Sequence, residues 1–211
     1  MDAKNKKIIA LAVPAVIVIL LDQISKYAIR TMPELQNWSV IDGWLAFNYT
    51  QNPGMALGLD WLSTPVISVI AICAVTGILG YVFYTLKHVN MLYMACMGLV
   101  VGGAIGNIID RLVLAKIESY GGILEGHVVD FIHFNLEIYG YPVFPYIFNV
   151  ADTAISVAII LLIIFNRQIM PVIDEKNNQA EVVESSPQPG GEQAPASEAS
   201  PLQGDDERDT N

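Results

Sequence analysis

Two aspartates in the second half of the chain, Asp130 and Asp152, have the features of a catalytic carboxylate pair. Neither has a Lys or Arg beside it in the sequence that would hold it permanently ionised. Two carboxylates that share a proton can perform both halves of peptide hydrolysis, because the ionised one takes a proton from water while the neutral one polarises the scissile carbonyl. Surroundings of low dielectric constant should push their pKa values apart. The pair therefore predicts acid–base chemistry on a peptide bond.

Two other aspartates have cationic neighbours and suit this chemistry less well. Asp22 and Lys26 are four residues apart, which places them on one face of a helix. Asp110 precedes Arg111, and Asn107 lies on the same helical face. Each of these two carboxylates thus has a possible neutralising partner. Structural ion pairs at helix ends, where long side chains reach water easily, are the alternative explanation for these polar groups.

Serine and metal mechanisms fit the sequence less well than a carboxylate pair. Ser25 and Lys26 are adjacent, so their side chains diverge around a helix and do not form a nucleophile–base pair. His127, Asp130 and His133 could bind a metal, but the sequence has no His-Glu-x-x-His pattern. Histidines of a loop at an interface are the simpler explanation, and we expect neither a metal nor a cofactor.

Long apolar blocks must position these residues. The chain of 211 residues is 53% hydrophobic with a mean hydropathy of +0.45, which is too apolar for an ordinary soluble domain. Because about 20 apolar residues cross a bilayer as a helix, four stretches qualify as spans: 8–29, 64–86, 91–113 and 149–170. Cys73 and Cys96 lie inside these blocks and are expected to act as small hydrophobic residues. The predicted fold class is a membrane all-α protein, a four-transmembrane-helix bundle.

The charge of the chain is unevenly distributed and divides it into two regions. Residues 1–170 carry 9 Lys and Arg against 11 Asp and Glu, whereas the remainder carries 2 against 10, which accounts for most of the net charge of −10. The acidic C-terminal segment is rich in Gln, Ser, Pro and Gly and has no aromatic residue, a composition typical of disorder. We therefore expect a membrane domain at 1–172 and a disordered cytoplasmic tail at 173–211.

Loop lengths and basic residues predict the direction of the spans. The segments 30–63 and 114–148 are each longer than 30 residues, so both must lie on the side opposite the short turn that joins spans two and three. The basic residues of the other side are Lys4, Lys6, Lys7, Lys87, His88 and Arg167, and they predict that both termini are cytoplasmic. A cleavable signal peptide is the alternative for the first span, but its apolar run is long and no cleavage pattern follows it.

The two long segments should form a small extracytoplasmic β element. The runs Trp38–Ile41, Trp44–Tyr49 and His127–Phe131 are compatible with strands and are separated by Gly, Pro and Asn turn signals. With this topology the polar ends of spans one, three and four reach the same outer depth of the membrane, together with Asp130 in the second loop. Intramembrane acids also mark ion pathways, so a transporter or proton relay is the rival hypothesis. In a third interpretation the aspartates only make structural hydrogen bonds.

Five motifs in this sequence resemble those of lipoprotein signal peptidase, also called signal peptidase II, over about residues 8–168. In chain order they are Leu21-Asp22-Gln23-Ile24-Ser25-Lys26, Asn48-Tyr49-Thr50-Gln51-Asn52-Pro53-Gly54-Met55-Ala56, Gly106-Asn107-Ile108-Ile109-Asp110-Arg111, Val129-Asp130-Phe131 and Phe148-Asn149-Val150-Ala151-Asp152. Leu57 stands where an aromatic residue is common in the family, which concerns a loop contact and not the chemistry.

The resemblance implies roles for individual residues. It makes Asp130 and Asp152 the catalytic dyad. The residues that it implies for substrate binding or support of the dyad are Asn52, Gly54, Asn107, Arg111 and Asn149. The structural or supporting groups are then Asp22, Lys26, Asp110 and Asn48.

The resemblance also implies the reaction and its setting. The expected enzyme is an aspartyl endopeptidase that removes the signal peptide from diacylglyceryl-modified prolipoproteins, cutting on the N-terminal side of the lipidated cysteine. Its partners would be these substrates and membrane lipid, with no nucleic acid, and the chain would act as a monomer. The expected location is the bacterial cytoplasmic (inner) membrane, with the active site near the outer face.

Overall fold

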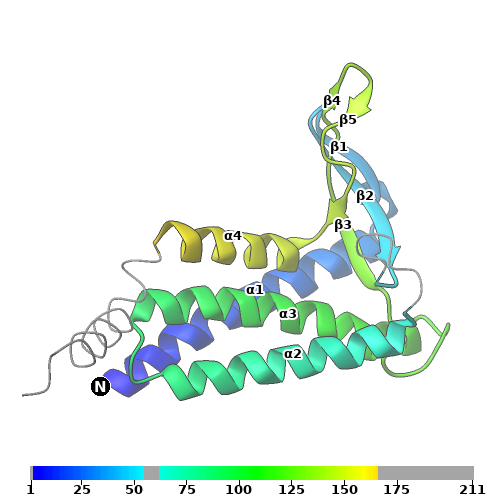
Figure 1. The fold of residues 1–211 in the computed structure, drawn as a ribbon. Coiled ribbons are helices and arrows are strands. Elements are labelled where there is room, and N and C mark those ends of the chain that lie inside the picture. Colours follow the sequence, from blue (N-terminus) through cyan, green and yellow to red (C-terminus); the bar gives the residue numbers. More distant parts are fainter. Residues whose placement is uncertain (1, 55–61, 166–211) are drawn as a thin grey trace, which may run out of the picture. The chain divides into compact units, whose positions relative to one another are not determined.

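The computed structural model describes residues 2–54 and 62–165, and within them the chain forms long helices and a small sheet (Figure 1). The helices are α1 (Ala3–Thr31), α2 (Thr64–Thr85), α3 (Met91–Ile117) and α4 (Val150–Ile164). In the described part, α1, α2 and α3 are long and apolar enough to cross a membrane, and α4 is a shorter apolar helix. The first three predicted spans are thereby confirmed as long apolar helices. Part of the fourth, residue Leu57 and the tail at 173–211 lie outside the described residues.

Glycines on α3 allow α1 and α4 to approach its backbone closely. A Cβ atom added at Gly102 would lie 2.7 Å from the carbonyl oxygen of Ala15 on α1. One added at Gly103 would lie 2.5 Å from the carbonyl oxygen of Ala151 on α4. Any side chain at either position would therefore push two helices apart.

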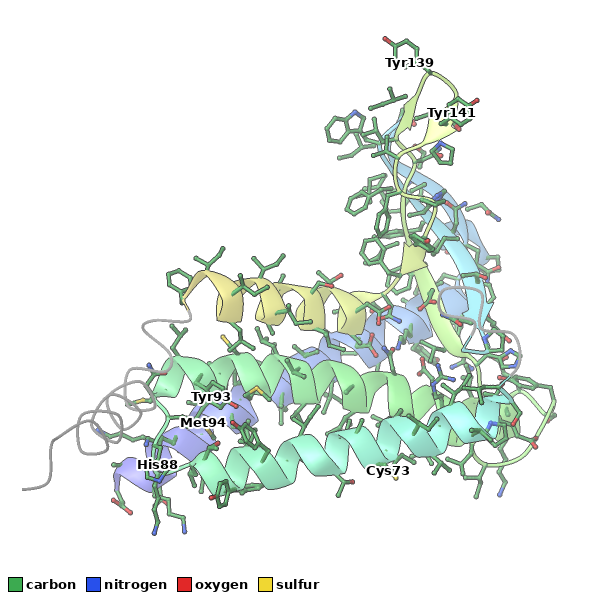
Figure 2. All side chains as sticks on the ribbon, viewed as in Figure 1. Cys73, His88, Tyr93, Met94, Tyr139 and Tyr141 are labelled. Carbon is green, nitrogen blue, oxygen red and sulfur yellow. The ribbon has the colours of Figure 1, made fainter. Side chains whose placement is uncertain are left out.

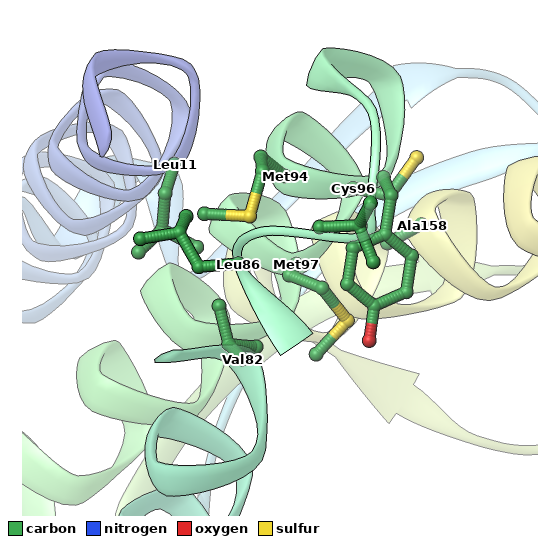
Figure 3. Close-up of a cluster of buried hydrophobic side chains, with 9 residues drawn as sticks. Leu11, Val82, Leu86, Met94, Cys96, Met97 and Ala158 are labelled. Atoms are coloured by element: carbon green, nitrogen blue, oxygen red, sulfur yellow. The ribbon is translucent and has the colours of Figure 1, made fainter. Parts of the chain in front are cut away.

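A buried cluster joins the helices at the end that holds the chain's N-terminus (Figure 3). Its buried members are Leu11, Val82, Leu86, Val89, Tyr93, Met94, Cys96, Met97 and Ala158. These residues come from all four helices and from the turn between α2 and α3. The cluster thus fixes the helices at the end opposite the sheet.

The two long interhelical segments combine into one antiparallel sheet. Its strands are β1 (Asn37–Ile41), β2 (Leu45–Asn52), β3 (Val128–Phe134) and β6 (Ile147–Phe148), in the order β1-β2-β3-β6. The three strands predicted from sequence are confirmed. A short hairpin of β4 (Glu137–Ile138) and β5 (Tyr141–Pro142), whose exposed Tyr139 and Tyr141 are labelled in Figure 2, was not predicted because each strand has only two residues.

A second buried cluster attaches this sheet to the helices. It consists of Ile29 at the end of α1, Leu114 near the end of α3, and Val129 and Phe131 of β3. Because side chains alternate along a strand, burial of Val129 and Phe131 against the helices fixes the register of β3 and hence the direction of Asp130 between them. Hydrophobic packing at the sheet thereby sets the position of a polar side chain.

Candidate active site

Asp130 lies in the middle of β3 and is 3% exposed. Its two carboxylate oxygens accept hydrogen bonds from two asparagine side chains. Asn52 Nδ2, at the end of the paired strand β2, donates at 3.0 Å, and Asn149 Nδ2 donates at 2.7 Å. Both donors are uncharged, so the carboxyl group is held in place without a permanent cationic partner.

Asp152 lies in the first turn of α4, where Asn149 is the N-cap residue. The Asp152 N–H donates to Asn149 Oδ1 at 2.9 Å, and Asp152 Oδ2 accepts from the Asn149 N–H at 3.3 Å. This reciprocal arrangement is a capping box, which satisfies two backbone donors that a helix start leaves without partners. The other oxygen, Asp152 Oδ1, accepts from Asn107 Nδ2 on α3 at 2.9 Å. The side chain is half-buried and fixed at both oxygens.

Asn149 links the two aspartates directly. Its side-chain amide contacts Asp130, its backbone N–H contacts Asp152, and its side chain is completely buried. The same Nδ2 also lies 3.1 Å from Asn107 Oδ1. The two carboxylates, 22 residues apart in the sequence, are therefore bound to one residue.

Lys26 lies on α1 and is 2% exposed. Its Nζ contacts Asp22 Oδ2 at 2.8 Å, Asp110 Oδ2 at 2.9 Å and Asn107 Oδ1 at 2.9 Å. An ammonium group has three N–H donors, so these three contacts occupy all of them. Asn107 links Lys26 to Asp152, because its side-chain carbonyl accepts a hydrogen bond from Lys26 while its side-chain amide donates one to Asp152.

The ionic partner of Asp110 differs from the one that the sequence suggested. Arg111 is adjacent in sequence, but the ion pair of Asp110 is with Lys26 on α1. Neighbouring residues of an α-helix point about 100° apart, so Asp110 faces α1 while Arg111 faces elsewhere. Asp22 pairs with Lys26 as expected from their spacing.

The two carboxylates bound to Lys26 also hold the backbone of the segments that carry Asp130 and Asp152. Asp22 Oδ1 accepts from the N–H of Ala151 at 3.0 Å, directly before Asp152. Asp110 Oδ2 accepts from the N–H of Val129 at 3.2 Å, directly before Asp130. A carboxylate at the start of a helix is favourable, because the free N–H groups there carry partial positive charge.

Gln23 completes this cluster, and sequence analysis gave it no role. Its Nε2 donates to Asp110 Oδ1 at 3.1 Å, to Asp22 Oδ2 at 3.2 Å and to the Gly106 carbonyl at 3.1 Å. The available signal was an amide beside Asp22 in an otherwise apolar helix. Ser25 donates to the carbonyl of Asp22 in its own helix, an ordinary helical contact.

Arg111 lies beside the end of β2 and is 9% exposed. It forms none of the ion pairs found among the described residues, although the charges of Asp130 and Asp152 act on it. Its Nη1 lies 3.5 Å from the Pro53 carbonyl oxygen, and a Cβ atom at Gly54 would come within 3.3 Å of it. Gly54 has φ +113°, and its N–H donates to Asn52 Oδ1 at 2.8 Å. The turn therefore needs glycine both for its backbone conformation and for the space beside the guanidinium.

The pKa of Asp130 is raised to about 6, chiefly by burial and next by the negative charge of Asp152. The hydrogen bonds from Asn52 and Asn149 and the charge of Lys26 act in the opposite direction. Burial outweighs them, since removing a carboxylate from water disfavours its ionised form. Asp130 can thus hold a proton close to neutral pH, as a general acid must.

The remaining residues singled out from sequence lie elsewhere in the sheet or, for His127, directly before β3. Asn48 Oδ1 contacts His133 Nδ1 at 3.0 Å, and the ring of His127 packs on Tyr120. His133 is three residues from Asp130 on one strand, so the two side chains point to opposite faces. His133 and Asp130 therefore do not point to one common metal site. Asn48 contacts His133, so it lies on the face of the sheet away from Asp130.

The sequence is similar to a family of known proteins over most of its length. A family model described as signal peptidase (SPase) II matches residues 14–167. A lipoprotein signal peptidase of Chlorobium phaeobacteroides (strain BS1) is 37% identical over 163 residues, which cover 72% of this chain and 93% of the relative. One of Streptomyces griseus is 36% identical, covering 77% of this chain and 75% of the relative.

The fold is also similar to solved structures. Two structures, each described as a bacterial membrane enzyme, match with TM-scores of 0.56 and 0.55. Their sequences are 31% and 30% identical to this chain. The first match covers 74% of this chain and 86% of the solved one, and the second covers 72% and 88%.

Proposed function

Given that the chain belongs to the signal peptidase II family, we propose that Asp130 and Asp152 are the catalytic dyad of this enzyme. The family membership makes the chain an aspartic endopeptidase that removes signal peptides from prolipoproteins. The observation that carries the proposal is the contact of one buried residue, Asn149, with both carboxylates. An activated water and a scissile carbonyl need two such groups held at a fixed separation.

Asp152 is the general base and Asp130 the general acid in this proposal. Asp152 is the more exposed of the two, so its carboxylate is the one that a water molecule can reach. Asp130 is almost fully buried, and its pKa of about 6 suits the protonated partner. The electrostatic asymmetry of the pair therefore assigns the two roles.

The reaction follows from these protonation states. The ionised Asp152 removes a proton from water as the water oxygen attacks the carbonyl carbon, and Asp130 donates its proton to the carbonyl oxygen. The tetrahedral diol then collapses: Asp152 gives its proton to the departing amide nitrogen, and Asp130 takes back the proton of the diol hydroxyl. Both aspartates return to their starting states, and one water has been added across the peptide bond.

Arg111 and the turn at Asn52–Gly54 form the substrate-binding side of the proposed site. Arg111 has no ionic partner among the described residues, so its guanidinium is free to donate to carbonyl oxygens of a bound peptide. It already approaches one peptide carbonyl, that of Pro53. Asn52 links this turn to Asp130, which couples peptide binding to the position of the acid.

We place this site near the outer face of the bacterial cytoplasmic membrane, in a bundle of four spans with both termini in the cytoplasm. The support is positional: the polar cluster lies where α1 and α3 end and α4 begins, while Lys4, Lys6, Lys7 and Lys87 lie at the opposite end. A proton relay would instead place its acids near the membrane midplane. The end of the predicted fourth span at residue 170 and the predicted domain boundary at residue 172 lie outside the described residues.

The proposed substrate carries a diacylglyceryl group on the cysteine that follows the cleaved bond. A lipid anchor confines the substrate to the bilayer, so its scissile bond reaches the depth at which Asp130 and Asp152 lie. The outward faces of α1 and α2 expose many apolar side chains, including Ile17, Leu20 and Ile70, which suits contact with acyl chains. The chain would act on such substrates as a monomer, without a cofactor.

The proposal is tested with Asp130→Asn and Asp152→Asn in reconstituted membranes. Either substitution keeps the size of the side chain but removes its acid–base function, so cleavage of a diacylglyceryl prolipoprotein should fall at least about 1000-fold. The unmodified prolipoprotein serves as a parallel substrate and should be cleaved poorly even by the parent enzyme. Turnover retained by both folded variants would refute the dyad.

A further inference from the structure

A hollow of about 640 Å³ lies at the end of the helices opposite the aspartates, between the start of α1 and the end of α2. Its polar wall consists of Lys4 and Lys7 of α1 and of Lys87 and His88, which follow α2. Figure 2 labels His88 at this end of the helices, away from the sheet. The proposed peptidase reaction uses none of these residues.

The three lysines have no carboxylate partner among the residues that the structure describes. None of the ion pairs in that part of the chain includes them. Lys7 is nevertheless held in place, because its Nζ donates to the Leu86 carbonyl at 2.9 Å and lies 3.3 Å from that of Lys87. A cation at the end of a helix is favourable there, since the last carbonyls carry partial negative charge. The hollow thus has a positive wall in which Lys7 is held in place and, within the described residues, no lysine is paired with a carboxylate.

The other wall of the hollow is apolar and aromatic. It includes Leu86, Phe83, which is 53% exposed, and Tyr84, which is 83% exposed. Aromatic side chains at the end of an apolar helix are typical of the membrane–water interface. The ligand that fits both walls has an anionic head and an apolar body.

The hollow lies at the boundary between the apolar and the charged part of the helices. In α1 the sequence changes from charged to apolar between Lys7 and Ile8, and after α2 it changes from apolar to charged between Leu86 and Lys87. The hydrogen bond from Lys7 to Leu86 places these two boundaries at the same level. This is the level of lipid headgroups when the helices cross a bilayer.

We propose that this hollow binds an anionic phospholipid, with the phosphate beside Lys4, Lys7 and Lys87 and an acyl chain along Phe83 and Tyr84. Basic pockets between transmembrane helices are suited to acidic headgroups, because the positive charges lie where the phosphate must be. Free phosphate would use only the cationic wall, and a second copy of the chain would need a carboxylate to meet it. Placing the lipid in the inner leaflet rests on the topology proposed above, whereas binding itself does not.

Native mass spectrometry of the full chain, released from detergent with phosphatidylglycerol or phosphatidylcholine, tests this proposal. The parent protein should retain phosphatidylglycerol in preference to phosphatidylcholine, and glycerol phosphate should not displace it. Lys4→Gln and Lys87→Gln should each weaken retention about fivefold, because each removes one charge beside the headgroup. Lys6→Gln is the matched control, since Lys6 is a neighbouring exposed lysine that does not line the hollow.

The outcomes separate the possible explanations. Equal losses in Lys6→Gln and Lys4→Gln would show unspecific attraction to acidic lipid and would overturn the proposal. Displacement of the lipid by glycerol phosphate alone would also overturn the proposal. Dimerisation of the chain in place of lipid retention would do the same. Cleavage of prolipoprotein by each variant in detergent reports on folding, and it should stay at the parent level, so failure of this site is distinguishable from failure of the proposed dyad.

Discussion

At the scale of single residues, the site depends on uncharged donors around its two carboxylates. Asn52, Asn107 and Asn149 hold Asp130 and Asp152 by hydrogen bonds, whereas the buried cation Lys26 reaches Asp152 only through Asn107. A direct cation would fix one aspartate in its ionised form and end its use as an acid. Amides orient the carboxylates and leave both protonation states available.

Asn149 caps α4 and donates a hydrogen bond to Asp130, and the substitution Asn149→Ser distinguishes these two roles. Serine is a good N-cap residue, so α4 should keep its start and the protein its thermal stability to within about 1 kcal/mol. Serine is too short to reach Asp130, so the acid loses its shortest hydrogen bond and kcat should fall about 100-fold. Peptide cleavage and thermal unfolding, measured on the same preparation, check this. Asn149→Ala is the control and should lower both the thermal stability and kcat. A normal kcat in Asn149→Ser would contradict the bridging role of Asn149.

The raised pKa of Asp130 predicts how activity changes with pH. Activity requires protonated Asp130, so kcat/KM, which reports the free enzyme, should fall on the alkaline side with an apparent pKa of about 6. The measurement is the pH profile of cleavage at low substrate concentration. Activity that declines only on the acid side would reverse the proposed roles.

The same shift predicts the pH dependence of stability. A carboxyl group whose pKa rises from 3.8 to about 6 on folding stabilises the folded state below pH 3.8, and this contribution is lost as the pH rises through about 6. The loss amounts to about 3 kcal/mol at most. Thermal unfolding should therefore show a decrease over this range that Asp130→Asn removes.

At the scale of elements, one buried ion cluster connects α1, α3, β3 and the start of α4. Asp22 binds the backbone before Asp152, Asp110 binds the backbone before Asp130, and Lys26 forms an ion pair with each of them. The helices and the strand that carry the aspartates are thus held by the same charges. We infer that the cluster sets the separation of the dyad.

Lys26→Met tests this connection. Removing the cation leaves two buried carboxylates without a partner, which should destabilise the protein by about 3–5 kcal/mol. Thermal unfolding in detergent measures the effect. The triple variant Lys26→Met, Asp22→Asn, Asp110→Asn removes both charges with the cation and should recover part of the stability. A single variant as stable as the parent would show that the cluster carries little energy.

The elements were largely predictable from sequence, and their contacts were less so. Spans of about 20 apolar residues and alternating strand patterns depend on local composition, so three spans and three strands could be placed. The partner of Asp110 could not, because the choice between Arg111 and Lys26 depends on how α1 rotates against α3. Gln23 was missed for the same reason.

At the scale of the whole molecule, the chain direction brings the polar residues together. The aspartates, asparagines and Lys26 come from five segments, and all lie where α1 and α3 end, α4 begins and the sheet is attached. That shared level was predictable from loop lengths and the order of spans. The bridge through Asn149 was not, because it requires the register of β3 against the helices, which the packing of Val129 and Phe131 determines.

The proposed active site and the proposed lipid site lie at opposite ends of the described helices. At the end with the aspartates, the buried Lys26 forms ion pairs with Asp22 and Asp110, whereas the lysines of the other end have no carboxylate partner in the described part of the chain. This asymmetry fits a protein whose chemistry takes place at one membrane face. Cleavage and lipid retention should therefore respond to different substitutions.

The most direct test of the central claim is the cleavage rate of Asp130→Asn, Asp152→Asn and the double variant on one diacylglyceryl prolipoprotein. Two groups that act on the same water and carbonyl work as a unit, so the double variant should be about as slow as either single variant. Losses that multiply in the double variant would show that the two aspartates act independently, and this would contradict a shared dyad.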